Sequence, residues 1–264
     1  MKKIAILLLA ILTFSCSDDD EKGTEEDKGQ WAMIFNETVK SDSNPVDRTE
    51  KFMFDGERLI QHIIKQRYFE EEISNEVNLS YSDNQVTVTT DYLTLVYTLN
   101  SEGYASQCVY SLSSQNRIYQ FSYSAEGYLT GIVENIDDIE YSSTSLTYEN
   151  GDITSISSKM NGLENKFIYE PGEESSTYHL PCLGLLEMHP LTFHIEALYA
   201  GLLGKDPRHF TIRSSPAGSN DEKTVYSYGF DKKGNPSRMI CQTTYAGGQA
   251  SYYPYTRNIS VSFE

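Results

Sequence analysis

A short hairpin pattern that recurs along the chain constrains its fold more than any other feature. Each copy has an alternating run of apolar or aromatic residues, a turn, and a second alternating run. The copies are KFMFDGERLIQHI, LSYSDNQVTVT, YTLNSEGYASQCVY, FSYSAEGYLTGIV, LTYENGDITSI and YSYGFDKKGNPSRMI. The glycines at or near the turns are Gly56, Gly103, Gly127, Gly151 and Gly234. Glycine adopts the left-handed backbone that such turns need, so each copy predicts a β-hairpin.

Within the copies the apolar period is two, as at Val86 and Val88, which is typical of strands with one buried face. Hairpins joined by short loops make a long antiparallel meander. Because a sheet of more than about ten twisted strands tends to curl, we expect a mainly β fold, curled into an open or half barrel.

The hairpin pattern stops at Pro171, and residues 171–222 are expected to form an insertion with a short helical part near residues 183–204. The apolar residues at helical spacing there are Leu191, Ile195, Leu198, Tyr199, Leu202 and Leu203. Pro190 fits the first turn of this helix and Gly204 its end. A helix with so broad an apolar face is predicted to lie buried against the concave side or open end of the sheet. Strands resume after about residue 223.

The first residues have the form of a lipoprotein leader. Lys2 and Lys3 precede nine apolar residues, from Ile4 to Leu12, and Ser15 precedes Cys16. An apolar run this short cannot span a bilayer core of about 30 Å. We therefore expect residues 1–15 to be a signal peptide and Cys16 to carry the lipid. The alternative is an ordinary cleaved leader with an incidental cysteine.

Residues 16–30 include SDDDEKGTEEDKGQ, which has no large apolar side chain and is expected to be a solvated tether. An acidic run behind a lipidated cysteine resembles the export signal of Bacteroidetes surface lipoproteins. This resemblance implies an outer-membrane lipoprotein facing the cell exterior. The alternative is a charged spacer on a lipoprotein that faces the periplasm.

The net charge limits the kinds of molecule that the protein is expected to bind, and the number of cysteines limits its disulfides. Two of the 21 basic residues lie in the leader, which leaves 19 basic against 38 acidic residues, a net charge of −19. Nucleic acid is therefore not an expected partner, whereas the membrane is, through the lipid anchor. Residues 31–264 are expected to form a single domain. The remaining cysteines, Cys108, Cys182 and Cys241, allow at most one disulfide.

The acidic tether, hairpins such as LTYENGDITSI and the segment ALYAGLLGKDPRHF together resemble a family of Bacteroidetes lipoproteins of unknown function with a porin-like fold. The resemblance covers roughly residues 50–264. It implies a porin-like fold and a location in the cell envelope, and it identifies no catalytic residues.

Candidate chemistry is sparse. His179, Cys182, His189 and His194 lie within sixteen residues, but their spacing fits a zinc site poorly, and we expect no metal. The carboxylates of Asp137, Asp138 and Glu140 are a possible acid–base pair for glycoside hydrolysis, with a solvated turn as the simpler interpretation. We predict no catalytic residues and no cofactor.

Exposed tyrosines are the candidate ligand contacts, because their rings stack on sugars or protein side chains. The densest group is Tyr245, Tyr252, Tyr253 and Tyr255, with cross-strand packing as the alternative. Trp31 lies beside the tether in the sequence and is therefore poorly placed to form the centre of a ligand-binding surface. Asp206 and Arg208 are interpreted as a helix-end turn stabilised by local hydrogen bonds.

These features favour a non-enzymatic envelope lipoprotein that binds an extracellular glycan or protein on its curved sheet. The alternatives are a surface or periplasmic hydrolase of glycans or peptides, and a structural accessory subunit of an envelope complex.

Overall fold

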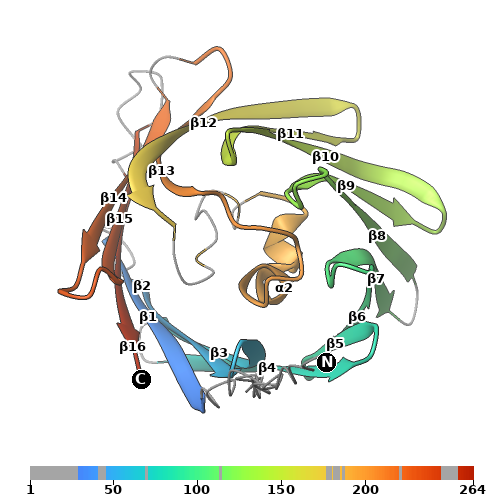
Figure 1. Cartoon of the computed structure of the whole chain (residues 1–264), viewed down its shortest axis with the longest axis horizontal. Helices are drawn as coiled ribbons and strands as arrows, with labels where there is room; N and C mark the ends of the chain where they lie inside the picture. Colours follow the sequence, from blue (N-terminus) through green and yellow to red (C-terminus); the bar gives the residue numbers. More distant parts are fainter. Residues whose placement is uncertain are drawn as a thin grey trace, which may run out of the picture.

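The computed structural model describes residues 29–40, 46–68, 71–112, 115–176, 180, 185, 188–219, 222–244 and 255–264. Its sixteen antiparallel strands form a closed barrel in which each strand pairs with its sequence neighbours and β1 pairs with β16 (Figure 1). The strands are β1 (Gln30–Lys40), β2 (Val46–Asp55), β3 (Arg58–Tyr68), β4 (Glu71–Ser82), β5 (Gln85–Thr89), β6 (Thr94–Leu99), β7 (Ala105–Leu112), β8 (Gln115–Tyr123), β9 (Leu129–Ile136), β10 (Ile139–Glu149), β11 (Asp152–Met160), β12 (Leu163–Ser175), β13 (His209–Pro216), β14 (Lys223–Phe230), β15 (Pro236–Thr244) and β16 (Tyr255–Phe263).

The expectation of an open or half barrel is wrong, because the first and last strands meet. β1 and β16 pair from Met33 opposite Phe263 to Lys40 opposite Thr256. Closure gives backbone partners to both edge strands, which an open sheet would leave exposed. The hairpin pattern predicted the meander, but it contains no signal for the pairing of two strands more than 200 residues apart.

All six repeated hairpins turn at the same end of the barrel, which we call the hairpin end. Three of them use one turn design. Asn100, Ser124 and Asp231 each accept hydrogen bonds through the side chain from backbone N–H groups two and four residues later. The glycine three residues on has positive φ in each case, 84°, 91° and 84°. These turns confirm the sequence-based prediction of hairpins with glycine at the bend.

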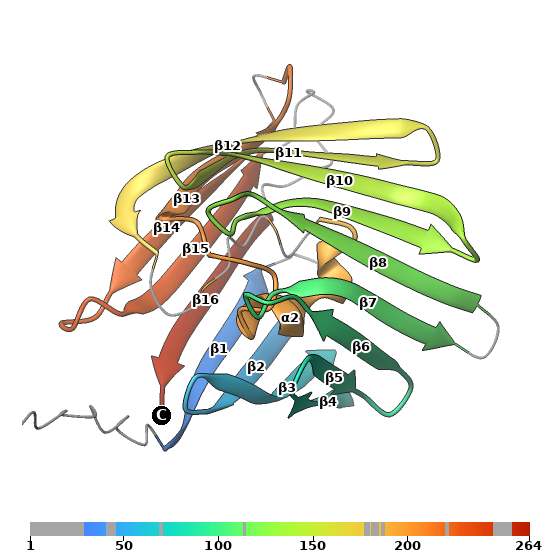
Figure 2. The same ribbon diagram turned by 45° about the vertical axis from the view of Figure 1, so that its right-hand side comes forward.

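The other end, which we call the mouth, carries the connections β1–β2, β3–β4, β5–β6, β7–β8, β9–β10, β11–β12, β13–β14 and β15–β16. In Figure 2 the mouth turns from β7 to β12 lie on the right and the β14–β15 hairpin lies on the left. Gln30, where β1 begins, and Glu264 both lie at the hairpin end, next to the β2–β3 turn.

The described part of the insertion between β12 and β13, residues 188–208, lies at the centre of the barrel (Figures 1 and 2). It contains the 3-10 helix η1 (Leu191–Phe193), which follows Pro190, and the five-residue helix α2 (Ile195–Tyr199). Of the described residues in the expected range 183–204, only these and Leu185 are helical. Tertiary packing inside a closed barrel, rather than a long helix, buries Leu191 and Leu198. We call residues 188–208 the plug.

Gly204 does not end the helix, as its position had suggested. Its φ is 90°, and a Cβ atom there would lie 2.6 Å from the Gly127 carbonyl oxygen. The residue lets the plug pass close to the β8–β9 turn. Gly201, with φ of 68°, follows the end of α2 instead.

The charged turn after Gly204 fastens the plug to the hairpin end through long-range contacts, not the local ones expected. The Lys205 N–H donates to Gly127 O at 2.9 Å, and the Arg208 N–H donates to Gly151 O at 3.1 Å. His209 contacts Asp152 twice, through its backbone N–H and its Nδ1, each at 2.8 Å.

The apolar core lies inside the barrel, around the plug. Charged and hydroxyl side chains point outward, as on β4, where Glu76, Asn78 and Ser80 are exposed and alternate with buried Val77 and Leu79. This outer face contrasts with the apolar outward band of a membrane-spanning barrel. Among the residues described, no helix is long and apolar enough to cross a bilayer.

Candidate functional site

Inward-facing side chains change from apolar to charged as the strands approach the mouth. On β1, Met33 and Phe35 are followed by buried Glu37 two residues further on. On β2, Phe52 is likewise succeeded toward the mouth by Glu50. Because inward positions recur every second residue, these carboxylates lie inside the barrel above the apolar core.

His62 on β3 lies between two carboxylates. Its Nε2 contacts Glu50 Oε2 at 3.1 Å and its Nδ1 contacts Glu196 Oε1, from the plug, at 2.8 Å. Burial alone would lower the pKa of His62, but the hydrogen bonds to Glu196 and Glu50 outweigh burial and raise it. A protonated His62 therefore ties the plug to the barrel wall by an ion pair on each side.

Two arginines neutralise the neighbouring carboxylates. Arg48 Nε lies 2.7 Å from Glu50 Oε1, and Arg257 on β16 contacts both carboxylate oxygens of Glu37. Burial favours a raised pKa for Glu50, yet the His62 hydrogen bond and the Arg48 charge overcome it and lower the pKa. We call the barrel interior between the apolar core and the mouth the chamber. On this side of it, the basic and acidic groups are paired with one another.

A second ion-pair cluster joins the plug to β8, β9 and β10. Buried Glu134 accepts a hydrogen bond from Ser142 at 2.7 Å and contacts His189 Nε2 at 2.6 Å. Arg117 Nε lies 3.3 Å from its other oxygen. Burial opposes ionisation of Glu134, but the His189 and Ser142 hydrogen bonds prevail and lower its pKa. Arg117 also lies over the Tyr141 ring, 6.0 Å from its centroid.

His194 has a different environment. It is fully buried among aromatic rings, and its Nδ1 lies 2.8 Å from the Tyr97 hydroxyl. Burial lowers its pKa to about 3, so the ring is neutral. It acts as a packed hydrogen-bonding group.

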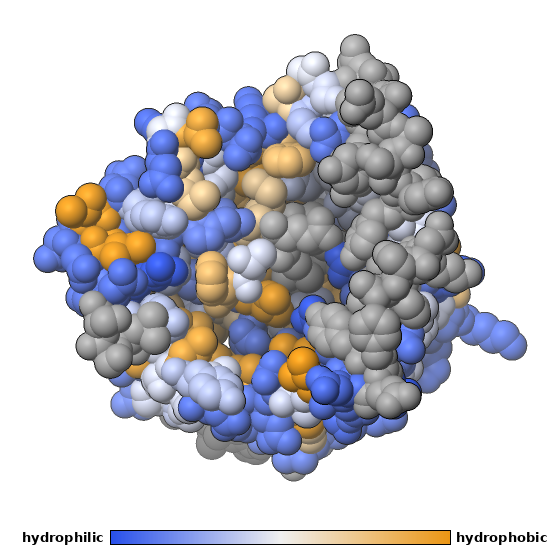
Figure 3. All heavy atoms as spheres, turned by 180° about the vertical axis from the view of Figure 1, so that it is seen from behind, coloured by the Kyte–Doolittle hydropathy of each residue, from blue (hydrophilic) through white to orange (hydrophobic). Residues whose placement is uncertain are grey.

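Two cavities open toward the mouth on either side of the plug. One, of about 180 Å³, lies between the wall of β4–β8 and the plug residues Thr192, Phe193 and Glu196. We call it the ring cavity. The other, of about 420 Å³, lies between the β11–β12 hairpin and Met188 and His189. Figure 3, which faces the mouth, shows the barrel hollowed there, with apolar side chains inside.

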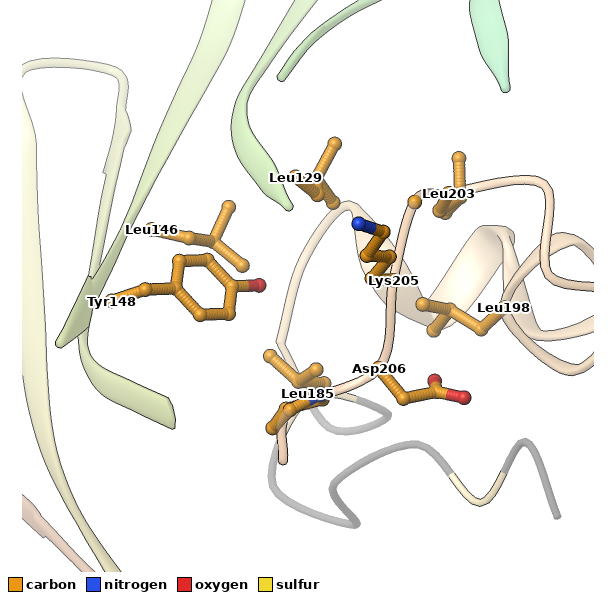
Figure 4. Close-up of a pocket in the computed structure, with 10 residues that line it drawn as sticks. Leu129, Leu146, Tyr148, Leu185, Leu198, Leu203, Lys205 and Asp206 are labelled. Atoms are coloured by element: carbon orange, nitrogen blue, oxygen red, sulfur yellow. The ribbon is translucent and has the colours of Figure 1, made fainter. Parts of the chain in front are cut away.

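A third cavity, near the hairpin end, is too small for a ligand. Its volume is about 20 Å³, roughly the space for one water molecule. Figure 4 shows Leu146 and Tyr148 of β10 facing Leu198 and Lys205 of the plug across it. This contact is packing between wall and plug.

The tyrosine group predicted as a ligand contact lies mostly outside the described residues. This holds for Tyr245, Tyr252 and Tyr253. Tyr255 begins β16 and pairs with Thr243 at the mouth. The lipid-attachment residue Cys16 also lies outside the described ranges.

The structure does not bring the possible zinc ligands together. His189 contacts Glu134, whereas His194 contacts Tyr97, and His179 and Cys182 fall outside the described ranges. In the described part of the chain, no three His, Cys, Asp or Glu residues are grouped to hold a metal ion.

The carboxylates of Asp137, Asp138 and Glu140 lie in and beside the exposed β9–β10 turn. Asp137 and Asp138 have φ of 49° and 65°, and Asp137 accepts a hydrogen bond from the Asn116 N–H. This matches the solvated turn. Trp31 stacks on Phe54 at the hairpin end, with ring centroids 4.2 Å apart.

Sequence reasoning missed the chamber residues Glu50, His62, Glu134 and Glu196. The sequence does contain a partial signal for two of them. Glu50 and His62 fall at positions of β2 and β3 that the alternation of apolar and polar residues assigns to the inward face. Nothing in the pattern indicates that Glu196, 134 residues from His62, reaches the same place.

Together the fold and chamber define a plugged antiparallel barrel with a polar outer face and a ligand-sized interior opening at one end. Residues 52–238 match the family model described as a domain of unknown function (DUF4595) with porin-like fold, and the chain belongs to this family. No curated protein matched the sequence.

Two solved structures are similar. A porin-like protein from Bacteroides uniformis is 27% identical, with a TM-score of 0.80, over 88% of this chain and 96% of that one. A porin-like protein from Bacteroides vulgatus is 12% identical, with a TM-score of 0.53, over 86% of this chain and 96% of that one. The second likeness concerns the fold alone.

Proposed function

We propose that this chain is a non-enzymatic, lipid-anchored lipoprotein of the cell envelope that binds an extracellular ligand through the mouth of its barrel. The observation that carries the proposal is that the start of β1 and the mouth lie at opposite ends of the barrel. Gln30, which the proposed tether precedes, lies at the hairpin end, and the two sizeable cavities found among the described residues open at the other end. A chain anchored through Cys16 then presents the mouth away from the membrane.

The interior chemistry supports binding over catalysis. In the described chamber each carboxylate is engaged by a basic partner: Glu37 by Arg257, Glu50 by Arg48 and His62, Glu196 by His62, and Glu134 by His189. Such pairing stabilises a fixed shape. A hydrolase would instead need two carboxylates converging on one open cleft.

The test of display is digestion of intact cells with a non-penetrating protease. The wild type is compared with a variant whose acidic residues from Asp18 to Glu21 are alanine. We expect the wild-type domain to be digested and the variant protected. Protection of both would place the domain in the periplasm and contradict surface display.

The test of binding is a thermal-shift screen of the full chain against glycans, peptides and small ring compounds. Thr192→Trp fills the ring cavity from an exposed position on the plug, and Thr89→Trp adds the same ring on the exposed outer face of β5. We expect hits shared by the wild type and Thr89→Trp and lost in Thr192→Trp. A screen without hits would contradict the binding function.

A second candidate, an accessory subunit that docks a partner protein, is favoured by the rim of the mouth. Large exposed apolar residues of the described chain gather there: Ile73, Tyr92, Ile139, Met160, Leu163 and Phe193. Such clusters mark interaction surfaces. Crosslinking on intact cells, lost on changing Ile139 and Leu163 together to serine, would support this role, and an unchanged pattern would oppose it.

A further inference from the structure

The ring cavity has the size of a single ring. Its volume is about 180 Å³, with Val77, Val88 and Leu95 on the barrel side. An engineered apolar cavity of about 150 Å³ in another protein binds benzene. The ring cavity therefore accommodates one six-membered ring or a branched group of similar size.

The lining favours an apolar body over a polyhydroxylated one. Aliphatic wall residues are joined by the rings of Tyr110, Tyr119 and Phe193. Thr90 and Thr192 also line the cavity, but its surface is mostly apolar. A sugar ring would bury hydroxyls against that apolar part, and each hydroxyl left there without a partner costs about 1–3 kcal/mol.

Among the described residues that line the ring cavity, Glu196 alone is charged. Its side chain is 13% exposed, and its Oε1 is engaged by His62 Nδ1 at 2.8 Å. His62 itself lies behind Glu196 and does not line the cavity. Since an ionised carboxylate only accepts hydrogen bonds, the group that meets it must be a donor, and a carboxylate ligand would be repelled.

We propose that the ring cavity binds a small amine: a compact apolar body of about one ring carrying a primary ammonium group, which pairs with Glu196. An ammonium forms a charge-assisted hydrogen bond, roughly twice as strong as a neutral one. The Phe193 ring, 49% exposed and part of the same lining, offers apolar contact to the body of the ligand beside this carboxylate. The acidic domain also raises the local concentration of cations. This inference rests on the proposed function, because both require the mouth to admit a ligand.

Three probes with one ring and different head groups test the inference: benzylamine, benzyl alcohol and benzoate. Each is titrated into the full chain and followed by ligand-observed NMR. We expect benzylamine to bind at least about fivefold more tightly than benzyl alcohol, from the gain of a charge-assisted hydrogen bond. Benzoate should show no saturable binding.

Three variants then test whether the amine binds in the ring cavity and pairs with Glu196. Glu196→Gln should reduce benzylamine affinity to about that of benzyl alcohol, while Glu76→Gln, on the exposed outer face of β4, should leave it unchanged. Thr192→Trp should abolish binding of benzylamine and benzyl alcohol alike.

The outcomes separate the two proposals. Equal binding of all three probes, blocked by Thr192→Trp, would overturn the amine while keeping the cavity as a binding site. Benzylamine binding unaffected by Glu196→Gln would overturn Glu196 as its partner. Failure of all three probes to bind would overturn both the amine and the ring cavity as the place where the proposed function is carried out.

Discussion

Acidification should destabilise this protein through His194, and the size of the effect follows from its burial. The ring is fully buried, with the Tyr119 ring edge-on at 4.4 Å between centroids. Burial lowers its pKa to about 3, against the opposing charge of Glu134. In the unfolded chain a histidine titrates near pH 6.5. Below that pH the unfolded state takes up a proton that the folded state does not bind.

The sign follows from this difference in proton uptake. The stability due to neutral His194 is fully present above about pH 6.5 and declines as the pH falls toward 3. Each pH unit in that window is worth about 1.4 kcal/mol, so the loss between pH 6.5 and pH 5 is about 2 kcal/mol. His62, whose pKa is raised, acts in the opposite direction and has its stabilising effect at low pH.

A difference measurement isolates His194 from the other titrating groups. Urea unfolding of the wild type and His194→Gln, followed by circular dichroism from pH 5 to pH 8, should give free energies whose difference is constant above pH 7. That difference should shrink by about 2 kcal/mol between pH 6.5 and pH 5. Leu191→Ala, in the same plug but without a titratable group, should show a difference from wild type that does not vary with pH. Parallel pH profiles for wild type and His194→Gln would refute the reasoning.

Three further changes test the plug and the anchor. Gly204→Ala should destabilise the fold by about 2 kcal/mol or more, because φ is 90° and the added carbon would lie 2.6 Å from Gly127 O; an unchanged melting temperature would contradict this. Leu191→Ala should lower the unfolding free energy by about 2–4 kcal/mol at neutral pH, whereas Leu163→Ala, 73% exposed, should change it by less than about 0.5 kcal/mol; equal losses in urea unfolding would refute the buried plug. Cys16→Ala should move the protein out of the membrane fraction on cell fractionation, and retention there would argue against the lipid anchor.

The chamber explains why a chemical-motif search along the sequence finds so little. Its charged residues are scattered over β1, β2, β3, β8, β9, β16 and the plug, at positions that look like irregularities in an apolar alternation. Glu134 and His189 are separated by 55 residues and Glu37 and Arg257 by 220, so no local spacing indicates that they are partners. These residues come into contact only because the strands close into a barrel.

The sequence by itself determined the local structure: hairpins at Gly56, Gly103 and Gly127, strands with one buried face, and an insertion that interrupts them. These features depend on backbone conformation and on an apolar period of two, both of which are read from neighbouring residues. It also indicated the family, which the match of residues 52–238 to the family model confirms.

The sequence also predicted that the insertion packs on the concave side of the sheet, but the tertiary structure alone decided that the sheet closes around it and that the mouth is lined with paired charges. Closure depends on β1 meeting β16, and the short helix α2 depends on the space the barrel leaves. Both are consequences of strand number, tilt and packing summed over the whole chain, which no window of neighbouring residues contains.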